Sequence, residues 1–320
     1  MLTVKKVETQ DFENIIELLE MFNNKDVDRM QWKRLFMPIC KKLNNDFFGF
    51  ALIDDNRYVG YIAGIQSERV INGKLQKFCN VSSWIIHPEY RNKKIGFMLF
   101  QALMTLENFN FYVLSPVKHT YKYYINDYGF KENTSKANTL LPFTFLNLCS
   151  NNSSLLINDS SIRNFLNEND KNIYDDHQLP EIFHILYRYK EQNIYCVIKP
   201  TPYSSYVLNT SLLISVFTKL WFKLFRKDFF SPKIKLGLVH YTNNPLLFSE
   251  SISKYNKKIC SHLKVIGLSI NDRYLPKRPK FCFKNNINCS GLYKSEELSQ
   301  DDFDTLYSEL TLLNLSHFQL

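Results

Sequence analysis

A strand, a turn, a basic loop and a helix are encoded in direct succession between residues 81 and 106. Val81–Ile86 is an apolar run that predicts a strand, and the apolar residues after the turn recur at helical spacing: Phe97, Leu99, Phe100, Leu103 and Leu106. The start of a helix presents unpaired backbone N–H groups and the positive end of the helix dipole. The loop before it carries Arg91, Lys93 and Lys94, and Gly96 allows a ligand to approach the backbone. This succession predicts an anion site of the kind that holds a diphosphate, although an ordinary basic turn between strand and helix is the alternative.

The segment from His87 to Leu99 reads H-P-E-Y-R-N-K-K-I-G-F-M-L. It resembles the acetyl-CoA loop of the GNAT superfamily of N-acetyltransferases, whose usual pattern is R/Q-x-x-G-x-G/A. Lys94 stands where that pattern has its first glycine. A lysine there can still donate its backbone N–H and adds positive charge, or it can block the loop in a degenerate copy. The resemblance implies an acyl-CoA site made by Ile85, Ile86, Arg91, Asn92, Lys93, Lys94, Ile95, Gly96 and Phe97.

The order of elements expected over the first 146 residues also resembles the GNAT core. The pattern predicts strands and helices in the following order: strand Leu2–Val7, a helix with Ile15, Ile16, Leu18, Leu19 and Phe22 on one side, a short helix Met30–Leu43, strands Phe48–Ile53, Tyr58–Ile65 and Lys77–Ile86, the helix to Leu106, strand Phe111–Leu114, helix Val117–Asp127 and a strand from Gly129. The resemblance implies an α/β (α+β) fold with a mixed, mostly antiparallel central sheet flanked by helices.

A second local match lies at residues 121–130, which read Y-K-Y-Y-I-N-D-Y-G-F. GNAT enzymes often carry a helix that ends in F-Y-x-x-x-G-F, whose tyrosine protonates the thiolate of the departing coenzyme A. Tyr124 is nearest that register, one residue further from the glycine than usual, and Tyr123 is its rival. A phenol suits the task because it is a proton donor at neutral pH. An aromatic packing face is the alternative for this cluster.

Acyl transfer to an amine also needs a group that takes a proton from the attacking nitrogen. Five polar side chains lie in or near the expected strands and loop: Glu68, Ser82, Ser83, His87 and Glu89. Each of them has an ordinary structural reading as a surface charge, a strand hydroxyl or a turn residue. The sequence therefore selects no base.

A chain of 320 residues predicts two domains. We expect a GNAT-like acyl-CoA-binding domain at 1–146, a linker or loop rich in Asn and Ser at 147–169, and a second α/β domain at 170–320. The second domain is expected to contain helices Glu181–Tyr189, Leu247–His262 and Glu296–Leu315 and strands Asn193–Lys199, Lys235–His240 and Leu263–Ile270.

This strand–helix–strand rhythm repeats that of the first half, and it resembles the tandem arrangements of the GNAT superfamily. Asn243-Asn244-Pro245 has neither the arginine nor the glycine of the loop, so the second unit is expected to be degenerate and not to bind coenzyme A. An unrelated α+β domain is the alternative.

Composition narrows the class of protein. The seven cysteines are scattered with no C-x-x-C pair, which indicates reduced thiols and no metal site, and the N-terminus lacks the apolar run of a secretory signal, so a cytoplasmic enzyme is expected. The net charge of +9 is dispersed and no nucleic-acid-binding motif accompanies it, so we expect no nucleic-acid partner.

Leu208–Phe225 is apolar but interrupted by lysines, which favours a core or interface helix over one resting on a membrane.

Together these observations predict an acyl-CoA-dependent N-acyltransferase. Its co-substrate would be acetyl-CoA, and its acceptor the amine of a small molecule such as an amino sugar. The sequence leaves two alternatives open, a catalytically inactive GNAT-like scaffold and an aminoacyl or long-chain acyl transferase at a membrane surface. It does not define the oligomeric state.

Overall fold

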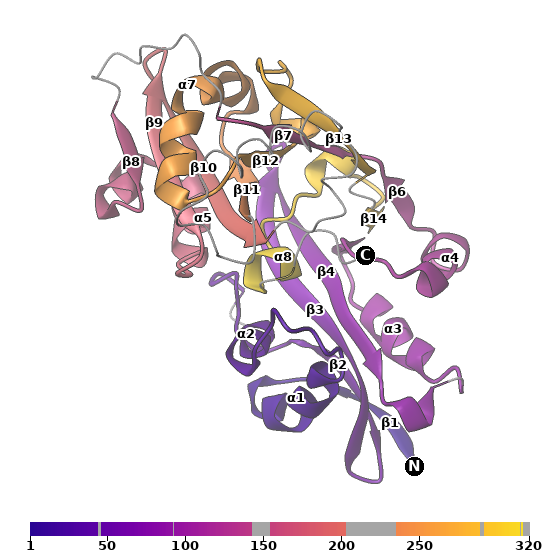
Figure 1. Ribbon diagram of the computed structural model, residues 1–320. Helices are drawn as coiled ribbons and strands as arrows, with labels where there is room; N and C mark the ends of the chain where they lie inside the picture. Colours follow the sequence, from indigo (N-terminus) through magenta and orange to yellow (C-terminus); the bar gives the residue numbers. More distant parts are fainter. Residues whose placement is uncertain are drawn as a thin grey trace, which may run out of the picture. The chain divides into compact units, whose positions relative to one another are not determined.

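The computed structural model describes residues 1–43, 46–91, 93–142, 154–202, 235–288, 291–313 and 315. The chain forms two compact units (Figure 1). Unit 1 is Met1–Asn133 together with Ser290–Leu315, and unit 2 is Thr134–Cys289. Each unit is built on one seven-stranded sheet, so the α/β fold with mixed, mostly antiparallel sheets flanked by helices is confirmed.

The sheet of unit 1 has the order β1-β2-β3-β4-β5-β14-β6, and β4 and β5 are its one parallel pair among the described strands. Its elements are β1 (Leu2–Lys6), η1 (Thr9–Asp11), α1 (Phe12–Glu20), α2 (Arg29–Lys33), η2 (Arg34–Phe36), β2 (Gly49–Asp54), β3 (Arg57–Ile71), β4 (Lys74–Ile86), η3 (Pro88–Tyr90), α3 (Gly96–Met104), β5 (Phe109–Val113), α4 (Lys118–Asn126), β6 (Lys131–Asn133), β14 (Gly291–Lys294), η7 (Gln300–Asp302) and α8 (Glu309–Leu312).

Helices cover both faces of the sheet of unit 1. Figure 1 shows α1 and α2 on one side of β2–β4 and α3 on the other. Because side chains alternate along a strand, Cys79 and Val81 of β4 pack with Leu99 and Leu103 of α3, whereas Asn80 between them faces the opposite side. The two faces therefore have separate sets of packing partners.

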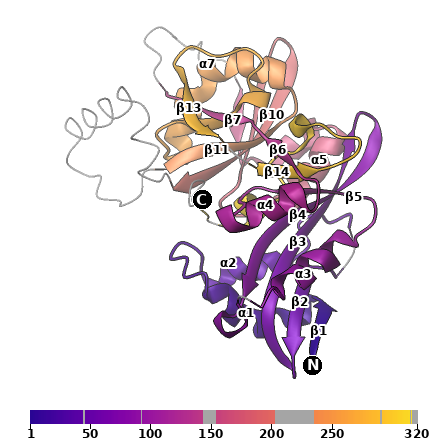
Figure 2. The ribbon, with the colours of Figure 1, turned by 90° about the vertical axis from the view of Figure 1, so that its right-hand side faces the viewer.

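The sheet of unit 2 has the order β13-β7-β12-β11-β10-β9-β8. Its elements are β7 (Lys136–Leu140), β8 (Leu155–Ile157), η4 (Ser160–Phe165), α5 (Glu168–Asp176), β9 (Phe183–Tyr189), β10 (Gln192–Pro202), β11 (Lys235–Thr242), α7 (Pro245–Leu263), β12 (Leu268–Asn271), η6 (Asp272–Tyr274) and β13 (Cys282–Asn288). Helix α7 joins the parallel strands β11 and β12, as α3 joins β4 and β5 in unit 1 (Figure 2). This repetition agrees with the tandem arrangement that the sequence predicts.

The units differ from the predicted ranges 1–146, 147–169 and 170–320. Strand β7 pairs with β12 and β13, so the chain enters the sheet of unit 2 already at residue 136. Strand β14 instead lies between β5 and β6 and returns the C-terminal segment to unit 1. Part of the expected linker is ordered as β8 and η4, and its residues 147–153 lie outside the described residues.

Two predicted helices are wrong. Residues 183–189 form strand β9, which pairs along its length with β10. An apolar run that is buried on both faces of a sheet has no periodicity that separates it from a helix. The expected helix Glu296–Leu315 is limited to η7 and the short α8, because the side chains of Asp304 and Ser308 accept hydrogen bonds from the N–H groups of Leu306 and Leu310 and divide the segment.

The apolar segment Leu208–Phe225 lies outside the described residues. Within the residues that the structure does describe, no helix has the length and apolar character needed to cross a membrane.

Candidate active site

The predicted anion loop lies where β4 ends and α3 begins. Arg91 is exposed, and its Nε donates a hydrogen bond to the carbonyl oxygen of Ile86 at 3.1 Å, which leaves the two terminal nitrogens of the guanidinium toward solvent. The Nζ of Lys93 lies 4.9 Å from the centre of the Tyr90 ring. The structure therefore gathers the basic side chains predicted from the sequence at the start of a nine-residue helix, with Asn92 outside the described residues.

The backbone of this loop explains the two glycines in the pattern that the segment resembles. Lys94 stands at the first glycine position and adopts φ +55°, the left-handed region that glycine occupies at no steric cost. Gly96 is the first residue of α3, and a Cβ built on it would lie 3.2 Å from Cγ1 of Ile86 and 3.5 Å from Nε1 of Trp84. The loop thus holds a left-handed residue at the position of the pattern's first glycine, although that residue is a lysine.

The polar residues of the turn before the loop are engaged with one another. Arg57 on β3 pairs with Glu89 at 3.0 Å and contacts Nε2 of His87 at 2.9 Å. Nδ1 of His87 accepts a hydrogen bond from the backbone N–H of Glu89. His87 and Glu89 therefore fix the turn, which accounts for both of these candidate bases. Glu68, a third candidate, faces Lys77 across the β3–β4 pair at 3.9 Å.

The pairing between β4 and β5 ends at Asn80, six residues before β4 itself ends at Ile86. Their parallel register runs from Lys77 to Asn80 on β4 and from Phe109 to Tyr112 on β5, and stops there. Further along β4 a β-bulge places Ser83 and Trp84 opposite Ile62 alone, and Ser83 has φ +48°. Beyond Asn80 no described strand pairs with the β5 side of β4. This unpaired edge, residues 81–86, is the opening between β4 and β5, and an extended ligand held at the loop can lie along it.

The two candidate tyrosines occupy different environments on α4. Tyr124 is buried, and its ring lies 5.0 Å from that of Phe100 and 6.2 Å from that of Trp84. Burial raises its pKa well above the usual range, and the nearby carboxylate of Glu309 raises it further, so the phenol stays protonated at neutral pH. Tyr123 is more than a third exposed and packs on Phe97, with ring centres 4.3 Å apart. Only Tyr124 reaches into the core of unit 1.

Sequence reasoning missed Glu309, the first residue of α8. Its side chain is buried on unit 1, where its Oε1 accepts a hydrogen bond from Oγ of Ser115 at 3.1 Å. Its backbone N–H donates to Oδ1 of Asn80 at 3.3 Å. Burial raises the pKa of this carboxyl to about 7, against the opposing effect of the hydrogen bonds from its own backbone N–H, Ser115 and Asn80. No local pattern marks it, because its partners lie about two hundred residues earlier in the chain.

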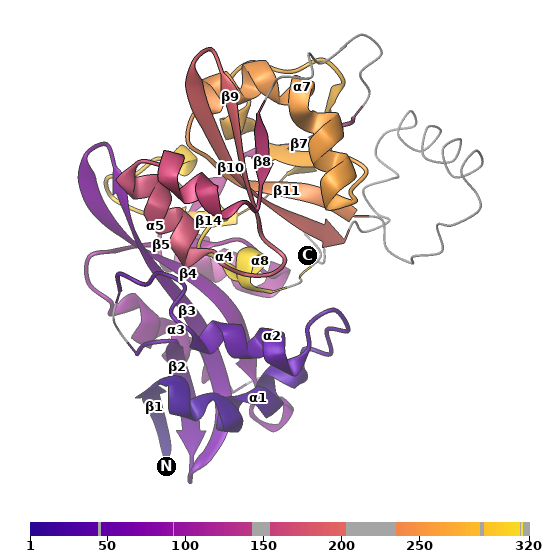
Figure 3. The same ribbon diagram turned by 90° about the vertical axis from the view of Figure 1, so that its left-hand side faces the viewer.

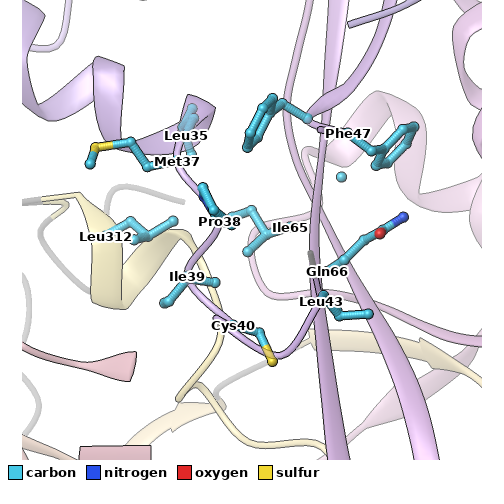
Figure 4. Close-up of a pocket in the computed structure, with 12 residues that line it drawn as sticks. Leu35, Met37, Pro38, Ile39, Cys40, Leu43, Phe47, Ile65, Gln66 and Leu312 are labelled. Carbon is cyan, nitrogen blue, oxygen red and sulfur yellow. The ribbon is translucent and has the colours of Figure 1, made fainter. Parts of the chain in front are cut away.

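A small apolar pocket lies beside α8, which packs on the segment that follows α2 (Figure 1, Figure 4). Its lining comes from the segment after α2, from residues 64–66 of β3 and from Leu312, one turn of helix after Glu309. The residues of the segment after α2 are Leu35, Met37, Pro38, Ile39, Cys40, Leu43, Phe47 and Phe48. Ile65 in its wall pairs with Asn80 across the β3–β4 ladder. The pocket therefore adjoins the point at which β4 and β5 separate.

The corresponding junction in unit 2 is built differently. Between β11 and α7 the side chain of Asn244 caps the helix by accepting a hydrogen bond from the N–H of Leu247 at 3.0 Å. Asn243 donates to the carboxylate of Asp170, which also accepts from the hydroxyl of Tyr241 at 2.7 Å. Figure 3 shows α7 against the sheet of this unit. A capped helix start beside a carboxylate does not favour a polyanion. Among the described residues of the whole chain, no group of three or more His, Cys, Asp or Glu side chains is placed to hold a metal ion.

Comparisons with known proteins find one family in sequence and several solved structures in fold. The model of the Acetyltransferase (GNAT) family matches residues 11–120, and no curated protein matches the sequence. Three solved structures are similar in fold. A GCN5-related N-acetyltransferase from Anabaena variabilis is 10% identical with a TM-score of 0.54, and the match covers 92% of this chain and 72% of that chain. A GCN5-related N-acetyltransferase from Kribbella flavida is 8% identical with a TM-score of 0.55, covering 92% and 70%.

The N-myristoyltransferase of Saccharomyces cerevisiae is 8% identical with a TM-score of 0.50, and the match covers 96% of this chain and 83% of that chain. At these identities the likeness is one of fold, and in all three it extends over both units. The family match covers the loop, the diverging strands and the start of α4. Residues 11–120 are thus similar in sequence to the Acetyltransferase (GNAT) family, and the chain as a whole is similar in fold to acyltransferases of known structure.

Proposed function

We propose that the protein transfers an acetyl group from acetyl-CoA to the amine of a small molecule by direct attack. The observation that carries this proposal is the basic loop at the start of α3, which adjoins the opening between β4 and β5. A polyanionic donor held at the loop extends its arm along the end of β4 toward that opening. No covalent enzyme intermediate is required, since holding the two reactants in line supplies much of the rate.

In this mechanism Arg91, Lys93 and the backbone of residues 94–97 hold the pyrophosphate of the donor. The guanidinium and ammonium groups supply charge, and the N–H groups of the helix start supply directed hydrogen bonds. The backbone of Ile85 and Ile86 aligns the pantetheine arm at the end of β4. Tyr124 supplies a proton to the departing thiolate, because its buried phenol is protonated at neutral pH and lies on the helix that follows β5.

For the acceptor we propose a small primary amine, with amino sugars as the first class to test. The pocket beside α8 favours a second class, amines with an apolar body, because its lining is apolar apart from Gln66 and backbone groups. We propose the cytoplasm as the site of action, because the seven cysteines are scattered along the sequence with no C-x-x-C pair, which is typical of reduced thiols.

The proposal is tested by measuring binding and turnover of acetyl-CoA. Acetyl-CoA is expected to raise the melting temperature, and Arg91→Ala to weaken its affinity about 10- to 100-fold, since hydrogen bonds to charged groups contribute about 1.5–3 kcal/mol each. Arg29→Ala is the matched control, because Arg29 is also exposed and its ion pair with Glu13 lies on α2 and α1, away from the loop.

Turnover is followed as release of the coenzyme A thiol in the presence of a panel of amino sugars and aralkyl amines, with acetyl-CoA and longer acyl-CoA donors in parallel. The absence of both a thermal shift and thiol release with acetyl-CoA would refute the proposal. Turnover only with long-chain donors would support acyl transfer to an amine but show that acetyl-CoA is not the donor.

A further inference from the structure

We infer that Glu309, brought into unit 1 by the C-terminal segment, is the general base that takes the proton from the attacking amine. This inference rests on the proposed function, because it assigns a role within the same reaction. It concerns a residue that lies outside the matched family region of residues 11–120.

The position of Glu309 is the first argument. Its backbone N–H is bound to Asn80, the last residue of β4 that pairs with β5, and its carboxylate is bound to Ser115, two residues after the end of β5. Both contacts lie at the point where the parallel strands separate. The carboxylate therefore lies at the opening into which the proposed mechanism places the reacting thioester.

The second argument is an unused lone pair. Glu309 is 1% exposed, and among the described residues its Oε2 has no hydrogen-bond partner. A buried carboxylate oxygen without a donor costs free energy unless a ligand supplies one. An N–H group of the attacking amine can donate the hydrogen bond that Oε2 does not receive from the protein.

The third argument is that Glu309 and Tyr124 approach the opening from different faces of the sheet. Tyr124 packs in the cluster that contains Val81, Val113 and α3, whereas Asn80, which binds Glu309, faces the other side. The pocket that contains Leu312 and Ile65 is on the same side as Asn80, since residues paired across a ladder point to the same face. Donor and acceptor can thus enter from opposite faces.

The C-terminal segment is held firmly enough to position a catalytic group. The guanidinium of Arg69 on β3 pairs with Asp304, donates to the carbonyl oxygen of Asp302 at 3.2 Å and lies over the ring of Phe78. The hydroxyl of Tyr112 donates to the carbonyl oxygen of Tyr307. These contacts anchor the residues directly before Glu309 to β3, β4 and β5.

The chemical step balances with these groups alone. The neutral amine nitrogen attacks the thioester carbonyl carbon, the N–C bond forms and the C–S bond breaks. The proton lost by nitrogen goes to Oε2 of Glu309, and the leaving sulfur takes the hydroxyl proton of Tyr124. Passage of the proton from the Glu309 carboxyl to the phenolate then restores the enzyme.

Glu309 is half ionised near neutral pH, since burial raises its pKa to about 7, which is the range that suits a general base. The carboxylate of Glu309 in turn raises the pKa of two nearby phenols, those of Tyr112 and Tyr124. Burial raises the pKa of both well above the usual range, so neither titrates near pH 7.

The test compares wild type, Glu309→Gln and Glu309→Asp as full chains, using thiol release from acetyl-CoA with the amine panel and with water as acceptor. Glu309→Gln is expected to lower kcat/KM about 100-fold or more while leaving the thermal shift with acetyl-CoA unchanged. The wild-type rate is expected to rise with pH through about 7, and the amide variant to lack this limb. Glu309→Asp should recover part of the rate and part of its rise with pH.

Glu297→Gln is the matched control, because it removes an exposed carboxylate from the same C-terminal segment and should leave rate and pH profile unchanged. Turnover of Glu309→Gln within a few-fold of wild type, with the same pH limb, would overturn the inference and leave the proposed function intact. Lack of any turnover or acetyl-CoA binding by the wild type would overturn both.

Discussion

Replacing Glu309 with glutamine is expected to stabilise the protein increasingly as the pH rises. In the unfolded chain the carboxyl titrates near 4.5, and burial raises its pKa to about 7 in the folded protein. Below pH 4.5 it is protonated in both states. Between these values the unfolded chain releases a proton that the folded protein retains, so the wild type loses stability as the pH rises and the loss is complete above about 7.

The difference of about 2.5 in pKa corresponds to about 3 kcal/mol, at about 1.4 kcal/mol for each unit. The glutamine side chain carries no charge at any of these pH values, so the variant does not lose the stability that ionisation of the buried carboxyl costs the wild type. Relative to wild type, the free energy of unfolding of Glu309→Gln is therefore expected to increase by about 3 kcal/mol between pH 4.5 and pH 8.5.

The assay is urea unfolding at a series of pH values, followed by tryptophan fluorescence, because two of the three tryptophans, Trp32 and Trp84, lie in unit 1. Glu297→Gln controls for the loss of one carboxylate from the same segment. A stability difference between Glu309→Gln and wild type that stays constant from pH 4.5 to 8.5 would refute the reasoning, because it would mean that Glu309 titrates alike in both states.

Three further predictions follow from the contacts described above. Lys94→Gly should stabilise the protein by up to about 1 kcal/mol in urea unfolding, since relief of the left-handed strain is partly offset by the greater freedom of glycine in the unfolded chain; a loss of stability would contradict this. Tyr124→Phe should lower kcat about 100-fold with acetyl-CoA affinity retained, and a larger loss for Tyr123→Phe would make Tyr123 the acid instead. Arg69→Ala should cost about 3–5 kcal/mol in urea unfolding, because it leaves Oδ2 of Asp304, whose side chain is only 13% exposed, without its ion-pair partner; Arg69→Met removes the same charge and should cost nearly as much, and a stability of Arg69→Met close to wild type would contradict the role of the charge.

The sequence was sufficient to predict the features that depend on residues close to one another in the chain. The apolar run before Pro88, the basic residues after it and the periodic helix from Gly96 are local signals, and the structure has each of them in place. The left-handed backbone at Lys94 agrees with the glycine of the pattern that the loop resembles.

Features that depend on distant contacts could not be predicted. Strand β14 lies between β5 and β6, although its residues are about 160 to 180 positions away along the chain. The spacing of Leu298, Phe303, Leu306 and Leu310 favoured a single terminal helix, but the fold buries most of this segment with only short helical turns, because it packs on β3, β4 and β5 through Arg69 and Tyr112. Glu309 could not be chosen as a site residue, since its role depends on this packing.

The insertion of β14 between β5 and β6 has a consequence for biosynthesis. A ribosome makes the chain from its N-terminus, so the loop at Arg91 and all of α4 are synthesised before the strand that completes their sheet. The sheet of unit 1 stays incomplete until β14 has emerged, while most of the strands of unit 2 are already available for pairing. Vectorial folding would therefore finish the sheet of unit 2 first and leave unit 1 without Glu309 until the segment after β14 has been synthesised.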